Sequence, residues 1–276
     1  MIVGVALKWV DRRPDVDALT GTVRTDPRSS GTSAADEAAL EWALRAAEAW
    51  DAEVLVATGG PPEAEVVLRD AVAAGAARAV RVDLPTGASS PLVAAGLAAA
   101  LADAALVLCG DWSLDRGSGS VPAFLAARLG AAQALGCTEL RLDPATPGAL
   151  RASRRLDGGR RERLALHSPA VVSVEGGTAR LRRASLHGVL GARAATIDVM
   201  AAPSGSVPAP TPGRGGPYRP RPRPLPPPPA QLDARQRILA LTGAISRRDP
   251  PKLVVLEPPA AADRILDQLR AWGYLP

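Results

Sequence analysis

The sequence predicts an α/β protein built on a doubly wound, mostly parallel sheet, with an antiparallel extension and a C-terminal helical arm. Three observations support this prediction. In the first half of the chain, short apolar runs alternate with longer segments of helical periodicity, a pattern typical of βαβ units with right-handed crossovers. After residue 136, short strand-like runs follow one another with turns between them. A proline-rich stretch then precedes the last helical segments.

The first half of the chain is expected to supply four parallel strands with three helices between them. Ser33 can cap the first helix, and Asp36 in its first turn suits the positive end of the helix dipole. Gly75 ends the second helix, and residues 58–61, Thr-Gly-Gly-Pro, are expected to form a turn. The predicted strands are residues 2–7, 53–57, 78–82 and 105–109, and the predicted helices are 34–50, 62–74 and 91–102.

The second half is expected to extend the sheet with antiparallel or mixed strands. Asp157-Gly158-Gly159 and Glu175-Gly176-Gly177 are hairpin signals, because paired glycines adopt the positive φ angles of tight turns. The strand-like runs lie at 138–142, 149–156, 161–166, 170–174 and 178–183.

The chain is predicted to divide into three parts. Residues 1–200 form a nucleotide-binding α/β domain, and residues 201–231 form a linker. The linker is rich in proline with interleaved arginines and is expected to be extended. Residues 232–276 form an arm with helices at 233–247 and 260–272 around a strand at 253–256. The arm is too small for a core of its own, so we expect it to dock on a partner.

The stretch 105–130 is the most informative part of the sequence. An apolar run leads into residues 110–120, which are polar and rich in glycine and serine, and an apolar-striped helix follows. Such a loop leaves backbone N–H groups free at a helix N-terminus, where they and the helix dipole favour a phosphate. Pro122 suits an early helical position. The alternative is an ordinary strand-to-helix turn, because the loop is neither a Walker A loop nor GxGxxG.

The composition of the chain argues against several classes of protein. The net charge is +5, but lysine occurs only at Lys8 and Lys252. The arginine and alanine content resembles the coding bias of a GC-rich genome, so the charge is weak evidence for nucleic acid. Cys109 and Cys137 lack the spacing of a disulfide framework or metal site, which favours a cytoplasmic protein. Asp103 interrupts the apolar stretch 92–110, so no stable membrane insertion is expected.

Motifs for bond-making chemistry are missing from the sequence. His167 and His187 stand far apart and have no sequence neighbours that suggest a triad or a metal site. There is no GxSxG, HExxH or recognisable carboxylate pair. We therefore expect a protein that carries out no catalysis on a substrate of its own.

Several segments together resemble the β subunit of electron transfer flavoproteins. Residues 3–10, Val-Gly-Val-Ala-Leu-Lys-Trp-Val, are similar to the family's V-A-V-K-x-V, and residues 33–44 resemble N-P-x-D-E-x-A-L-E-E-A-L. Residues 106–121 match L-x-x-C-G-x-x-x-x-D-x-x-x-G-Q-V. Further matches are L-R-x-A-L-A-M-G-A-D-x-A at 68–79, D-G-G at 157–159, P-A-V-V-T-V at 169–174 and S-L-P-G-I-M at 185–190.

This resemblance implies an adenine-nucleotide α-hydrolase-like fold and a heterodimer with an α subunit. The α subunit holds most of the FAD, and the β subunit binds a structural AMP. The dimer carries electrons from a donor dehydrogenase to an acceptor and has no substrate chemistry of its own. Leu186 corresponds to the leucine that docks on the dehydrogenase. The implied AMP site comprises Ala6, Ser33, Ala34, Ala35, Asp36, Gly59, Gly110, Asp115, Arg116, Gly117, Ser118, Gly119, Ser120 and Val121.

The sequence also departs from the family pattern. Ser33-Ala34 replaces Asn-Pro, Ser120 replaces the loop glutamine, and Asp111-Trp112 replaces Lys-Gln. Residues 191–194 lack the family's basic run, which suggests a different dehydrogenase partner. The linker and the ending Leu-Arg-Ala-Trp-Gly-Tyr-Leu-Pro are most similar to the actinobacterial variant associated with the mycofactocin redox system.

Two other interpretations stay open at this point. Universal stress proteins also combine this α/β pattern with a nucleotide site, so a stand-alone ATP- or AMP-binding module is the main alternative. The lack of a glycine-rich ATP loop speaks against it. The arginines of the linker motivate a nucleic-acid binder, but Tyr218 is the only residue there that could stack on a base.

Overall fold

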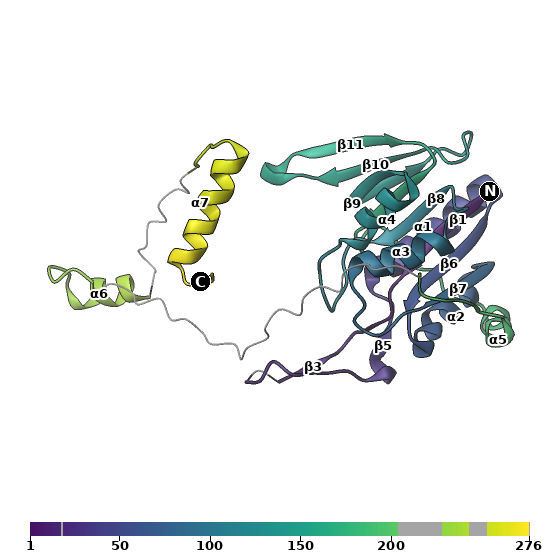
Figure 1. Ribbon diagram of the computed structural model, residues 1–276, viewed down its shortest axis with the longest axis horizontal. Helices are drawn as coiled ribbons and strands as arrows, with labels where there is room; N and C mark the ends of the chain where they lie inside the picture. Colours follow the sequence, from purple (N-terminus) through teal and green to yellow (C-terminus); the bar gives the residue numbers. More distant parts are fainter. Residues whose placement is uncertain (18, 204–227, 243–252, 276) are drawn as a thin grey trace. The chain divides into compact units, whose positions relative to one another are not determined.

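A nine-stranded mixed sheet forms the centre of the protein in this computed structural model, which describes residues 1–17, 19–203, 228–242 and 253–275. The strand order is β11-β10-β9-β12-β8-β1-β6-β7-β13 (Figure 1). The strands from β9 to β13 in this order run parallel, and β10 is antiparallel to both neighbours. The fold is therefore the predicted doubly wound α/β sheet with an antiparallel extension.

The first half of the chain follows the prediction closely. The strands are β1 (Ile2–Leu7), β6 (Glu53–Gly60), β7 (Arg78–Asp83) and β8 (Leu106–Gly110). The helices are α1 (Ala34–Trp50), α2 (Glu65–Ala74), α3 (Ser90–Ala100) and α4 (Val121–Leu129). The turn expected at 58–61 is wrong in part, because Gly59 and Gly60 continue β6 and pair with Val82 and Asp83 of β7.

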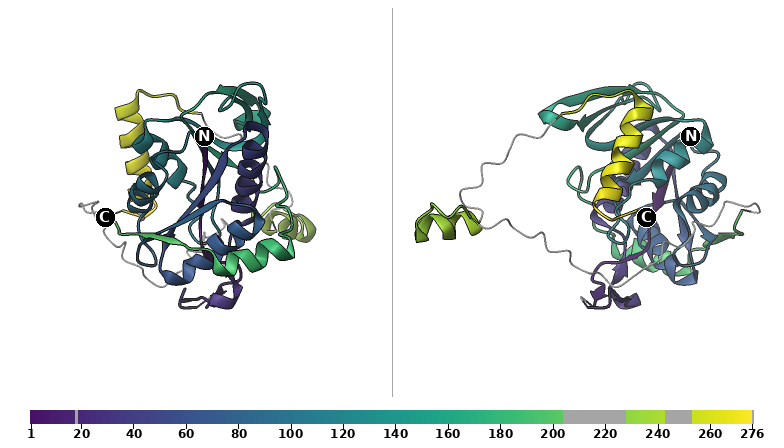
Figure 2. Two further views of the ribbon diagram at one scale, coloured as in Figure 1. Left: turned by 90° about the vertical axis from the view of Figure 1, so that its right-hand side faces the viewer. Right: turned by 60° about the vertical axis from the view of Figure 1, so that its left-hand side comes forward.

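Helices cover both faces of the sheet (Figure 2). Helices α1 and α2 contribute to one buried apolar cluster, and α3 and α4 contribute to the other. Nearly all buried side chains are alanine, valine or leucine, and Trp50 is the one aromatic among the buried core residues of the described chain. A core of such small side chains allows helices and strands to approach closely and leaves little of the packing to aromatic rings.

The antiparallel extension consists of β9 (Ala132–Leu142), β10 (Leu150–Arg155) and β11 (Arg161–Leu166), and β12 (Ala170–Val174) returns to the parallel part. Strand β9 begins six residues before the predicted run 138–142, because Ala132 pairs with Ala170 of β12. The hairpin predicted at Asp157-Gly158-Gly159 is confirmed, and both glycines have positive φ.

The strands predicted at 178–183 and 253–256 and the hairpin predicted at Glu175-Gly176-Gly177 are wrong. Residues 178–183 form no strand, and Glu175-Gly176-Gly177 makes a turn without a returning strand. This segment instead lies against the core through Leu181 and is bonded to α1 through Arg182. Residues 253–256 have no strand partner within the described chain.

Some elements were not predicted. Helix α5 (Leu186–Ala194) and strand β13 (Asp198–Met200) follow the segment 178–185. Two small ladders lie between β1 and α1: β2 (Val10–Asp11) with β5 (Ser30–Gly31), and β3 (Asp15–Val16) with β4 (Val23–Arg24). One-turn 3-10 helices span Pro27–Ser29, Pro62–Ala64 and Asp157–Gly159.

The chain forms two compact units, Met1–Tyr218 and Arg219–Pro276. The second unit contains α6 (Ala234–Leu241), capped by Asp233, and α7 (Pro258–Ala271). The helix predicted at 233–247 ends earlier within the described residues, and most of the predicted linker lies outside them. The division at 1–200, 201–231 and 232–276 stays a prediction.

Candidate nucleotide-binding cleft and docking helix

A cleft opens at the carboxyl ends of β1, β6 and β8, beside the N-terminus of α4. Along the chain, β6 and β7 follow on one side of β1, whereas β8 lies on its other side. The sheet therefore reverses its winding direction between β1 and β8, and ligands of doubly wound sheets bind at such a switch point. About 730 Å³ of empty space lies in and at the mouth of the cleft, part of it open solvent.

The loop between β8 and α4 forms one wall of the cleft. Ser118, Gly119 and Ser120 line it, followed by Val121 and Pro122 in the first turn of α4. Ser120 is the N-cap residue, but its side chain does not cap the helix and lies 3.1 Å from the Ser118 hydroxyl. The first-turn N–H groups of α4 therefore donate no hydrogen bond to the cap side chain and are available to donate to an anion.

Gly119 gives this loop its shape. Its φ is +56°, and a Cβ placed there would stand 2.5 Å from the carbonyl oxygen of Asp111. An L side chain would be strained by this φ and would also collide with the backbone on which the loop folds. The glycine is thus required for the shape of this wall of the cleft.

Asp36 lies at the floor of the cleft. It occupies the third position of α1, is 5% exposed, and shares a hydrogen bond with the Ser33 hydroxyl. Burial raises the pKa of Asp36 to about 6, although hydrogen bonds from Ser33 and from the backbone of Lys8 and Gly110 oppose this shift. Gly110 leaves room for the carboxylate, since a Cβ there would lie 2.6 Å from Asp36 Oδ1.

Two cationic side chains lie at the rim of the cleft. Lys8 Nζ forms an ion pair with Asp115 at 2.6 Å and a hydrogen bond with Ser113 at 3.3 Å. Arg116 donates to the carbonyl of Gly87 at 2.5 Å, which joins the loop after β8 to the loop before α3. Lys8 is neutralised by Asp115, so Arg116 is the cation at the rim that suits a phosphate.

The structure brings most of the predicted nucleotide-site residues to this cleft. Those that line it are Ala6, Asp36, Gly59, Gly110, Arg116, Ser118, Gly119, Ser120 and Val121. The others do not line it. Ser33 caps α1, Asp115 holds Lys8, and Gly117 packs beside Trp112. Ala34 approaches Gly176, and the buried Ala35 approaches Gly110.

Sequence reasoning missed other residues that line the cleft. Lys8 directly follows a strand that ends at the switch point, so its position was a usable signal. Trp112 lies in the predicted loop and could have been included on the same ground. Ser90, Val93 and Leu97 of α3 also line the cleft, and nothing in their local sequence indicates it.

Leu186 begins helix α5, so the predicted docking loop is a helix here. Leu186 is 76% exposed, and Val189 and Leu190 of the same helix are also exposed. The helix is held from the other side. A Cβ on Gly188 would stand 2.4 Å from the carbonyl of Ala73 in α2, and Arg69 of α2 donates to three carbonyls at the C-terminal end of α5.

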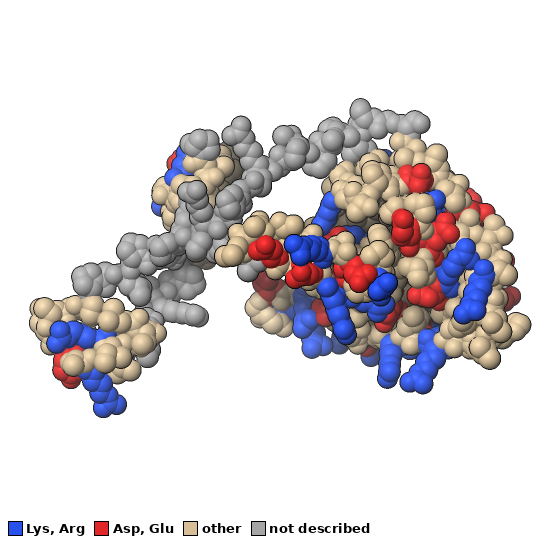
Figure 3. Space-filling model, turned by 90° about the horizontal axis from the view of Figure 1, so that it is seen from below, with Lys and Arg blue, Asp and Glu red and all other residues tan. Residues whose placement is uncertain are grey.

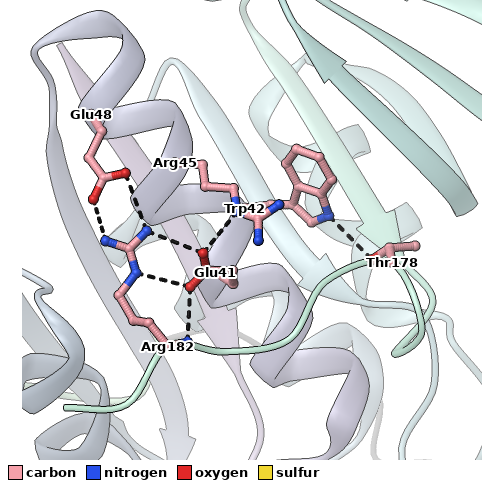
Figure 4. A network of polar contacts seen from close by, with 6 residues as sticks. All are labelled: Glu41, Trp42, Arg45, Glu48, Thr178 and Arg182. Atoms are coloured by element: carbon pink, nitrogen blue, oxygen red, sulfur yellow. Dashed lines mark hydrogen bonds and ion pairs between the residues drawn. The ribbon is translucent and has the colours of Figure 1, made fainter.

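A charged network fixes the chain just before α5 (Figure 4). Arg182 binds both Glu41 and Glu48 of α1, and Glu41 also accepts a hydrogen bond from Arg45 at 2.8 Å. Burial tends to raise the pKa of Glu41, but the hydrogen bonds from Arg182 and Arg45 outweigh it and lower the pKa. The same helix α1 thus carries Asp36 in the cleft and the anchor of the segment that leads into α5.

The two cysteines are buried in the fold. Cys109 and Cys137 are both free and buried, and burial raises the pKa of each thiol, to about 11 for Cys137. Among the described residues, no group of three His, Cys, Asp or Glu side chains could hold a metal ion. No helix in this part of the chain is long and apolar enough to cross a membrane.

The fold and the cleft define the class as a doubly wound α/β protein with a cleft at the switch point of its sheet. The profile of the electron transfer flavoprotein domain matches residues 23–204. The chain belongs to the electron transfer flavoprotein β-subunit family.

Three relatives show the extent of this similarity. An electron transfer flavoprotein subunit beta from Bradyrhizobium diazoefficiens is 32% identical over 162 residues, or 57% of this chain and 63% of the relative. The subunit of the same name from Methylophilus methylotrophus is 31% identical over 56% of this chain and 60% of the relative. Protein FixA from B. diazoefficiens is 30% identical over 66% of each chain. The match therefore spans less than two thirds of each relative's length.

Proposed function

We propose that this chain is the β subunit of an electron transfer flavoprotein. It pairs with an α subunit to carry electrons on FAD from a donor dehydrogenase to a downstream acceptor, in the cytoplasm. The observation that supports this most strongly is that residues 110–121, which match a family motif, form one wall of a cleft at the switch point of the sheet. In this role the protein is an electron carrier and has no substrate of its own.

The cleft fits AMP. Ser118, Gly119, Ser120 and the first turn of α4 would hold the phosphate through backbone N–H groups, which do not depend on the replaced family glutamine. The small residues Ala6 and Gly59 leave space for the adenosine part between strand ends and α3. FAD would be shared with the α subunit, and this chain would supply only part of its surroundings.

The exposed surfaces support a role in a larger assembly. Helix α5 presents Leu186, Val189 and Leu190 outward while its other side is anchored to α2, and an exposed apolar patch of this kind suits a contact with the donor dehydrogenase. In the second unit, Ile238 and Ile265 are each about 60% exposed. We propose that this arm docks on the α subunit. Assignment to the mycofactocin-associated actinobacterial variant stays a finer proposal of the same kind.

Co-expression with a flavoprotein α-subunit homologue tests the proposal. The chain should purify as a yellow 1:1 complex, and the chain alone should retain no flavin. The alternative, a stand-alone module of the universal-stress-protein type, predicts a colourless protein that binds ATP or AMP without a partner. A well-folded heterodimer without flavin would contradict the electron-transfer role.

A further inference from the structure

The antiparallel extension carries an unusual concentration of arginine on one face. In the regular ladder of β10 and β11, alternate residues share a face, and β9 contributes Glu139 and Arg141 opposite Ser153 and Arg151. We call this surface the arginine face. Its charged residues are Arg141, Arg151, Arg155, Arg161, Arg163 and Glu139. The other face of the same strands carries leucines that pack on the core.

Like charges stand directly opposite one another on this face. Arg141 pairs across the ladder with Arg151, and Arg155 pairs with Arg161. Cross-strand pairs of like charge destabilise a sheet. Arg141 and Arg155 are compensated by ion pairs with Glu139 and Glu175, each at 2.7 Å. Arg151, Arg161 and Arg163, all exposed, form no ion pair with any residue that the structure describes.

Protection of a sheet edge explains only part of this pattern. Strand β11 is the edge of the sheet, and charged side chains on an edge strand oppose unwanted pairing with other chains. That account covers Arg161 and Arg163. It does not cover Arg141 and Arg151, because they lie on β9 and β10, which have neighbours on both sides.

The shape and chemistry of the arginine face indicate what it can bind. A shallow groove runs over it, lined by Arg141, Arg151, Ser153 and Arg163 among others. Guanidinium groups bind carboxylates through paired hydrogen bonds. The groove has no aromatic side chain on which a base could stack. On the side of the first unit seen from below in Figure 3, which faces away from β10 and β11 as drawn at the top of Figure 1, Lys and Arg are instead interspersed with Asp and Glu.

We propose that the arginine face is a docking surface for an acidic segment of a partner protein. Carboxylates placed over Arg151 and Arg163 would relieve the repulsion among the arginines, and Glu139 and Glu175 would set the register by repelling misplaced acidic groups. This surface is separate from the nucleotide cleft and from α5, so the inference does not depend on the proposed function.

This inference can be tested with a fluorescein-labelled poly-L-glutamate peptide of about 20 residues. Fluorescence anisotropy at low salt measures the binding of this peptide to the full chain. The double variant Arg151→Glu/Arg163→Glu should bind the peptide about tenfold more weakly than the wild type. The matched control Arg13→Glu/Arg78→Glu changes net charge equally at exposed arginines elsewhere, and we expect it to stay within about twofold. Both variants keep the arginines of residues 203–229.

Three results would overturn the proposal. In the first, the wild type does not bind the peptide. In the second, the two double variants bind the peptide equally weakly. In the third, a dT20 oligonucleotide displaces the peptide from this face at a lower concentration than unlabelled peptide does. The last result would indicate a nucleic-acid surface. If charge reversal prevents folding, Arg151→Gln/Arg163→Gln should still weaken peptide binding, and failure to do so also counts against the inference.

Discussion

Arg182 and Glu41 join two segments that lie 141 residues apart in the sequence. The Arg182 backbone N–H and Nε donate to Glu41 Oε2 at 3.1 and 3.0 Å, and Nη2 donates to Oε1 at 3.2 Å. The Glu41 side chain is only 6% exposed, so this contact fixes the segment 178–185 on α1. The helix that presents Leu186 begins directly after that segment.

Arg182→Ala should lower the free energy of unfolding by about 2 kcal/mol, because it leaves a buried carboxylate with Arg45 as its remaining cation. This figure is set below that of a fully buried pair because Arg182 is one third exposed. Urea unfolding measures the change, and Arg182→Lys should recover part of it. Arg183→Ala removes an exposed neighbour and should change stability by less than about 0.5 kcal/mol. Equal losses in the two alanine variants would contradict the role of this network.

Asp36→Asn should change how stability depends on pH. The pKa of Asp36 in the folded protein is raised to about 6, so the folded state holds a proton that the unfolded state releases at lower pH. Stability from this group is therefore present below the unfolded pKa and is lost as pH rises through about 6. Relative to Asp36→Asn, the wild type should lose about 2 kcal/mol between pH 4 and pH 7 in parallel urea titrations. A constant difference between the two proteins would show that Asp36 is not strained by burial.

Gly119→Val should reduce the AMP affinity of the complex by about tenfold, since the strain of a positive φ and the collision with Asp111 distort the loop. Nucleotide content after purification provides the measurement. Gly130→Val is the matched control. Gly130 has a φ of +60°, but a Cβ added there would meet no atom within 4 Å, and it lies at the opposite end of α4. AMP loss in both variants alike would place the site elsewhere.

Leu186→Ala should slow electron transfer from the donor dehydrogenase while leaving FAD bound, because in the proposed complex the exposed side chain would contact the dehydrogenase and not the flavin. Stopped-flow reduction of the complex by its dehydrogenase measures the rate. Val199→Ala, an exposed apolar residue on β13, should leave the rate unchanged. Normal transfer kinetics in Leu186→Ala would contradict a docking role for this leucine.

Local sequence signals were sufficient to predict helices and strands whose apolar residues recur with one period and whose ends carry a cap or a turn. The limits of α1 follow from the Ser33 cap and the apolar stripe, and β11 is delimited by Asp157-Gly158-Gly159 and the turn at 167–169. Residues 178–183 alternate like a strand but bind α1 instead. They cannot return beside β12, because β12 is already paired with β9 on one side and β8 on the other. Strand β13 is short and pairs with β7, more than a hundred residues away, so no local pattern announces it.

The candidate site shows the same limit. The loop 110–121 was predicted because strand, glycines and helix follow one another in the sequence. Ser90, Val93 and Leu97 reach the cleft only because α3 crosses the sheet on the same face as α4. Such a contribution depends on the three-dimensional crossover and is absent from the local sequence.

The most direct test of the central claim is the nucleotide content of the complex formed with an α subunit. Acid release followed by chromatography should yield one FAD and one AMP per heterodimer, and Gly119→Val should lower only the AMP. Purification of a heterodimer without FAD, or of a chain that binds ATP and forms no heterodimer, would contradict the assignment as an electron-transfer subunit.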